Sequence, residues 1–99
     1  MDLLTYIKRG EEKAGGRNQL AALLNVHPER VTAAKGLREA LRDDACVILA
    51  QLIGENPLSV IAASKLIMEK HPERRAVWLP FVQEITATIN NPSSRISIL

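Results

Sequence analysis

The chain has 99 residues and a formal net charge of +2, with 46% apolar residues, 3% aromatic residues and one cysteine. This length fits one small domain with a modest core, and the scarcity of aromatic side chains favours packed helices over a sheet. A lone cysteine excludes an internal disulfide and indicates a reducing, cytosolic setting. We find no apolar run long enough to cross a bilayer and no secretory signal pattern, so we expect a cytoplasmic protein.

Positive charge is concentrated in one part of the sequence. Residues 13–42 carry six basic and two acidic side chains, whereas residues 43–99 carry five basic and six acidic ones. Such a distribution is typical of a surface that attracts phosphate, although a solvated surface would look the same.

Three helices are predicted in the first 36 residues. The first begins after an N-cap at Asp2 and ends at Gly15-Gly16, with an apolar stripe of Leu3, Leu4, Ile7 and Ala14. The second covers residues 17–24, with Leu20, Ala21, Leu23 and Leu24 directed inward. Asn25 suits a left-handed turn, and the third helix then starts at Pro28, with His27 as its cap, and closes at Gly36.

Three more helices are predicted in the second half. Asp43 and Asp44 open a largely buried helix that Gly54 ends, and Asn56-Pro57 opens the next, which breaks at His71-Pro72. A sixth helix begins near Glu73, and Pro80 is expected to kink or divide it. The prediction is an all-α fold of five or six short helices, with residues 1–90 as a single domain and residues 91–99 as a tail.

The stretch from Arg17 to Gly36 fits a helix-turn-helix. This motif needs a small residue where its helices cross, a residue tolerant of positive φ in the turn, and apolar residues that fix the angle between the helices. Ala21 meets the first requirement and Asn25 the second. The apolar positions are Leu20, Leu24, Val26 and Val31.

This arrangement resembles the repressor and Cro-type regulators of bacteriophages, and the likeness covers roughly residues 3–85. Matching pieces beyond the motif are Asp43-Asp44, the junction from Ile53 to Pro57, and Arg75-Ala76-Val77-Trp78. The resemblance implies a lambda-repressor-like helix-turn-helix domain with a C-terminal helical extension. It also implies a sequence-specific transcriptional regulator that binds a palindromic operator in double-stranded DNA, in a bacterial or phage-infected cell.

The third helix would enter the major groove with its first turns. The expected base-reading residues are Glu29, Arg30, Thr32 and Ala33. Phosphate contacts are expected at the start of the second helix and beyond the third, from Arg17, Asn18, Gln19, Lys35 and Arg38.

Because one short helix reads only a few base pairs, the regulator is expected to be a homodimer on paired half-sites. The C-terminal helices offer apolar surface for the interface, although the same residues could simply form core. The residues expected at this interface are Leu66, Trp78, Leu79, Phe81, Val82 and Ile85.

Enzyme chemistry, a metal site and a cofactor are not expected. His27 and His71 are far apart in sequence, and Cys46 lies in an apolar run. The alternative is a helical protein-binding module, antitoxin-like or an adaptor, because Gly16, His27 and Ala34 depart from the pattern of the regulators. Convergence of Arg17, Arg30, Lys35 and Arg38 on one face would favour DNA binding, and scatter would favour the alternative.

Overall fold

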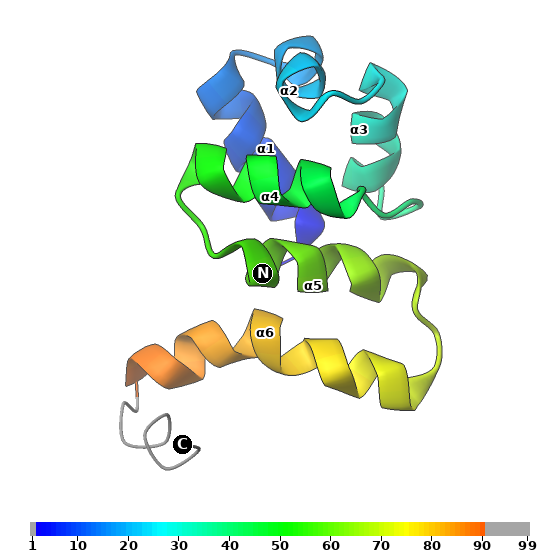
Figure 1. Ribbon diagram of the computed structural model, residues 1–99, viewed down its shortest axis with the longest axis vertical. Coiled ribbons are helices and arrows are strands. Elements are labelled where there is room, and N and C mark those ends of the chain that lie inside the picture. The colour runs from blue at the N-terminus through cyan, green and yellow to red at the C-terminus, as the bar shows by residue number, and fades with distance from the viewer. Residues whose placement is uncertain (1, 91–99) are drawn as a thin grey trace.

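A computed structural model describes residues 2–90 of the chain, with side chains described through residue 82. This range contains six α-helices and no strand, which confirms the predicted all-α class. They are α1 (Leu3–Ala14), α2 (Arg17–Leu24), α3 (Pro28–Lys35), α4 (Asp43–Ile53), α5 (Pro57–Met68) and α6 (Pro72–Asn90). In Figure 1, α4, α5 and α6 follow one another as layers, and α2 and α3 lie at the end of the molecule away from α6. The predicted tail, residues 91–99, lies outside the described residues.

Local signals set the limits of the first helices, as predicted. The Asp2 carboxylate accepts a hydrogen bond from the Thr5 N–H at 3.1 Å, which makes Asp2 the N-cap of α1. Gly15 ends this helix with a φ of 101°. Asn25 ends α2 with a φ of 57°, and its N–H bonds back to the last turn of that helix. The turn between α2 and α3 therefore has the left-handed residue that a helix-turn-helix requires.

The two helices that begin with the sequence His-Pro-Glu-Arg, α3 and α6, share one capping geometry. His27 Nδ1 accepts from the Glu29 N–H at 3.2 Å, and His71 Nδ1 accepts from the Glu73 N–H at 3.3 Å. Proline follows each histidine at the first helical position, where no donor is needed. The cap at His27 was predicted from the sequence, whereas the cap at His71 was not.

The apolar residues predicted to join α2 and α3 form part of the core. Leu20, Ala21 and Leu24 are almost fully buried, as is Val31 of α3, and Val26 packs against them. The prediction for Leu23 was wrong, since its side chain is 52% exposed. Residues 20, 21 and 24 already define the buried stripe of this eight-residue helix, and residue 23 points about 100° away from residue 24 around the helix axis.

Gly10 is a close-packing position in the middle of α1. It is buried, and a Cβ built on it would lie 2.5 Å from Leu49 Cδ1 and 3.2 Å from Leu20 Cδ1. The missing side chain therefore lets α1 pack closely against α2 and α4. The sequence had indicated only that glycine weakens a helix at this point.

Two ion pairs tie α1 to the rest of the domain. The Arg9 guanidinium bonds to Glu55 at 2.9 Å and to the carbonyl of Ile53, at the end of α4, at 3.0 Å. The Glu11 carboxylate accepts from the Lys35 ammonium at 3.0 Å. Lys35 lies in the last turn of α3, so this pair fixes α3 against α1.

The segment between α3 and α4, residues 36–42, is held to α5 by a buried serine. Ser64 Oγ accepts from the Leu41 N–H at 2.8 Å and donates to the Leu41 carbonyl at 2.9 Å, and Ser64 is 1% exposed. The left-handed residue after α3 is Leu37, with a φ of 57°, whereas Gly36 has an ordinary φ of −80°. Gly36 does end α3 as predicted, but the chain reverses one residue later.

The outer helix α6 packs along α5. Arg75 Nη1 donates to the carbonyls of Leu66 and Glu69, each at 2.7 Å, and so satisfies the open end of α5. Pro80 lies inside α6 without dividing it, and Figure 1 shows one ribbon from Pro72 to Asn90. The side chains of Val77 and Phe81 remain 60% and 36% exposed.

Candidate nucleic-acid interface

Helix α3 presents a polar face to solvent while its other face enters the core. Val31 and Ala34 are fully buried, whereas Glu29, Arg30 and Thr32 are exposed. The helix is anchored at its start by the His27 cap and at its end by the ion pair of Lys35 with Glu11. These anchors hold its outer face in a fixed position relative to α1 and α2.

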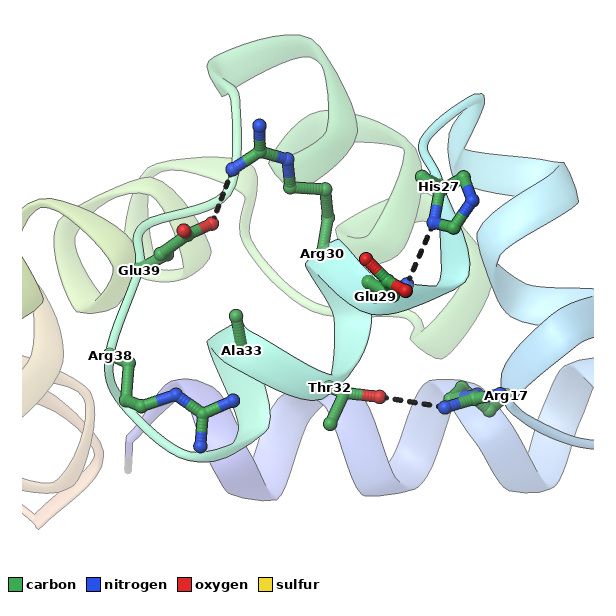
Figure 2. Close-up of a pocket in the computed structure, with 8 residues that line it drawn as sticks. All are labelled: Arg17, His27, Glu29, Arg30, Thr32, Ala33, Arg38 and Glu39. Atoms are coloured by element: carbon green, nitrogen blue, oxygen red, sulfur yellow. Dashed lines mark hydrogen bonds and ion pairs between the residues drawn. The ribbon is translucent and has the colours of Figure 1, made fainter.

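The polar face of α3 lines a hollow of about 620 Å³, which we call the α3 hollow. Figure 2 shows that its walls come from the start of α2, the first turns of α3 and the segment after α3. The lining residues are Arg17, His27, Glu29, Arg30, Thr32, Ala33, Arg38 and Glu39. Three arginines therefore face one space together with two glutamates.

Arg17 extends from the start of α2 to the middle of α3. Its Nη1 donates to Thr32 Oγ1 at 2.9 Å (Figure 2). Its Nε lies 3.4 Å from the Asn18 side-chain oxygen. Both partners are neutral, so no carboxylate among the described side chains compensates the positive charge of Arg17. The arginine also holds the Thr32 hydroxyl, which directs that side chain along the outer face of α3.

The other two arginines differ in their pairing. Arg30 forms an ion pair with Glu39, which lies in the segment after α3 (Figure 2). Arg38 forms no ion pair with the side chains that the structure describes. Its guanidinium lies beside the last turn of α3, since a Cβ built on Gly36 would be 3.0 Å from Nη1. Arg17 and Arg38 thus offer uncompensated positive charge on either side of α3.

The predicted DNA contacts are only partly brought together. Arg17, Arg30 and Arg38 line the α3 hollow, but Lys35 does not, because it is paired with Glu11 of α1. The predicted base-reading residues Glu29, Arg30 and Thr32 are exposed in the hollow, whereas Ala33 lines it with an exposure of only 9%. Asn18 and Gln19 are exposed at the start of α2.

Glu39 lines the hollow and pairs with Arg30, although it was not predicted as a site residue. It follows α3 by four residues, and no local pattern marks it as a partner of Arg30. The backbone reversal at Leu37 brings residue 39 back alongside α3, and this reversal occurs at a leucine that has little tendency to adopt positive φ. The ion pair thus depends on a backbone conformation that the sequence does not signal.

The predicted interface residues lie on α5 and α6. Leu66, Trp78, Leu79 and Val82 are half-buried, Phe81 is exposed, and Ile85 lies outside the described side chains. The rings of Trp78 and Phe81 are 6.4 Å apart between centroids and tilted by 55°. Among the described residues of these helices, Leu58, Met68 and Val77 are also exposed large apolar side chains, and they were not predicted as interface residues.

The thiol of Cys46 faces the core, as its apolar surroundings in the sequence suggested. Burial raises the pKa of this thiol to about 11, because the thiolate would lose its solvation there.

Across residues 2–90, no helix combines the length and apolarity that a membrane crossing requires. Comparisons of the chain with protein-family models, with characterised proteins and with solved structures gave no match.

Proposed function

We propose that the protein binds double-stranded DNA through the outer face of α3, as a small transcriptional regulator. The observation that carries the proposal is the grouping of Arg17, Arg30 and Arg38 around the polar face of one exposed helix. These arginines come from three different segments, so the cluster is not a consequence of helical spacing. A helix of this kind, preceded by a second helix and a tight turn, suits insertion into a major groove.

In this proposal the arginines divide into positioning and reading roles. Arg17 at the start of α2 and Arg38 beyond α3 lie where they can contact the DNA backbone on either side of the inserted helix. Glu29 and Thr32 face the base edges, where a carboxylate can accept from cytosine and a threonine methyl can contact thymine. Arg30 is the residue best suited to guanine, because a guanidinium can bond to both acceptors on its edge.

We further propose a homodimer, a palindromic operator and a cytoplasmic location, in line with the resemblance to phage repressor and Cro-type regulators. Half-sites would lie about 34 Å apart. Support for a dimer comes from the apolar side chains that α6 leaves exposed, above all Val77 and Phe81. If α6 forms the interface, Val77→Asp should convert a dimer into a monomer in sedimentation experiments, whereas Ala76→Asp, at an exposed position next to it, serves as the matched control.

A second candidate function is recognition of a protein partner. Two glutamates in the α3 hollow favour it, because they reduce the excess of positive charge there to one. Lys35 is also unavailable to phosphate while it is paired with Glu11. This alternative predicts that the α3 hollow will not bind nucleic acid at low salt.

Binding of a labelled random-sequence duplex, measured across a salt series, tests the proposal. Each phosphate contact contributes about −0.9 to the slope of log affinity against log salt. Arg17→Ala and Arg38→Ala should each weaken binding and make this slope shallower by about 0.9 per bound subunit. Arg74→Ala on α6 removes the same charge from a residue that is paired with Glu69, and it should change neither quantity. Absent binding, or binding that ignores salt, would refute the proposal.

A further inference from the structure

One arginine of the α3 hollow already has an acidic partner within the chain. Arg30 Nη1 contacts Glu39 Oε2, with side-chain exposures of 64% and 43%. Glu39 belongs to the segment that Ser64 holds at Leu41, two residues later. The backbone that carries this carboxylate is therefore anchored two residues away by a buried hydrogen-bonded contact. Arg17 and Arg38, in the same hollow, have no carboxylate partner among the described side chains.

We propose that Glu39 is a specificity-determining residue, which withholds Arg30 from the phosphate backbone and reserves it for a base edge. The inference rests on the proposed DNA-binding function. On random duplex the available partners of Arg30 are phosphate oxygens, which offer a guanidinium much the same interaction as the Glu39 carboxylate does. Exchange of the carboxylate for a phosphate therefore adds little to the binding free energy. In addition, the Glu39 carboxylate, once released, would face the negative DNA backbone.

A correctly placed guanine changes this balance. Its O6 and N7 accept two parallel hydrogen bonds from one guanidinium, in a geometry that only one base at one position can provide. An exposed ion pair is weak enough to be broken for such a contact. Arg30 therefore contributes to affinity when the DNA carries guanine at that position, and it contributes little on other sequences. Arg17 and Arg38, in contrast, bind the backbone of any duplex.

The test is a double-mutant cycle with Arg30→Gln, Glu39→Gln and the double variant. Selection from a randomised duplex pool first gives the preferred sequence, and each protein is then titrated with that duplex and with a random one. In the otherwise unchanged protein, Arg30→Gln should weaken the preferred duplex at least three-fold and leave the random duplex nearly unchanged. Glu39→Gln should tighten binding of the random duplex and steepen its salt slope by about 0.9 per bound subunit. This gain should disappear in the double variant.

The expected size of the gain follows from the slope. The affinities compared are those of Glu39→Gln and of the wild-type protein for the random duplex. A difference of about 0.9 in slope changes their ratio roughly three-fold for each fourfold change in salt concentration. Glu73→Gln changes the net charge equally at an exposed residue of α6 and serves as the matched control. Helix α6 lies at the end of the molecule away from α3 (Figure 1). Because exposed ion pairs contribute little to stability, all variants should fold, which thermal unfolding checks.

The possible results separate the two claims. If Glu39→Gln gives no gain, if its gain persists without Arg30, or if Arg30→Gln weakens both duplexes equally, the inference about Glu39 is overturned while DNA binding stands. If neither the wild-type protein nor any variant binds duplex DNA at low salt, the proposed function itself fails, and the inference fails with it.

Discussion

The hydrogen bonds between Ser64 and Leu41 should make a large contribution to stability for a single hydroxyl group. In Ser64→Ala the N–H of Leu41 loses its acceptor, and its carbonyl keeps only a long contact of 3.9 Å with the Cys46 thiol. Leu41 is 5% exposed, so water cannot readily replace the hydroxyl. An unsatisfied buried backbone group costs about 1–3 kcal/mol. We therefore expect Ser64→Ala to lower the free energy of unfolding by about 2 kcal/mol.

Chemical denaturation and thermal unfolding measure this loss. For a domain of this size, 2 kcal/mol corresponds to a decrease in Tm of about 8–16 °C. Ser59→Ala is the matched control, because Ser59 lies in the same helix and is 2% exposed, and its hydroxyl has no hydrogen bond among the described residues. Equal effects of the two substitutions would refute the reasoning. Since Ser64 holds the segment that carries Arg38 and Glu39, Ser64→Ala should also reduce the preference for the selected duplex over a random one at temperatures where the protein stays folded.

Three further predictions concern single positions in the core and the turn. Tyr6→Phe should leave stability unchanged or raise it by up to about 1 kcal/mol in urea unfolding, because the buried Tyr6 hydroxyl has no hydrogen-bond partner among the described residues; a marked loss would reveal a partner. Asn25→Ala should destabilise by about 1 kcal/mol, since alanine tolerates the φ of 57° poorly, while Asn25→Gly should be nearly neutral. The raised pKa of Cys46 stabilises the fold fully below the ordinary thiol value of 9.0, and this contribution is lost as the pH rises toward about 11. The stability difference between the wild-type protein and Cys46→Ala should therefore shrink over that range, and a constant difference would contradict the assignment.

The parts of the fold that could be predicted are those encoded within a few residues. Asn25, Gly54 and the prolines at the starts of α3 and α5 act on their own backbone, so their positions limit the helices directly. The apolar spacing of α2 and α3 likewise predicted Leu20, Leu24 and Val31 as core. In an eight-residue helix, however, an additional leucine can fall outside the stripe, as Leu23 does.

The features that the sequence did not reveal depend on contacts between distant residues. From the sequence alone, Gly10 is only a position that weakens its helix. The structure shows that Leu49 and Leu20 pack directly against it. In the same way, no residue near Lys35 in the sequence indicates that Lys35 will form an ion pair with Glu11 of another helix. Most of the residues that line the α3 hollow were therefore named from the sequence, but Glu39 and the ion pairs were not, because these depend on which charges the fold brings together.

The most direct test of the proposed function is a map of backbone amide chemical shifts during titration with a duplex of the selected sequence. Binding through α3 predicts that the largest shifts occur at Arg17, in the first turns of α3, and at Arg38 and Glu39. The amides of α6 should then shift little, since α6 lies at the other end of the molecule in Figure 1. Shifts concentrated on α5 and α6, with α3 unchanged at saturating DNA, would contradict the assignment of the α3 hollow as the DNA-binding surface.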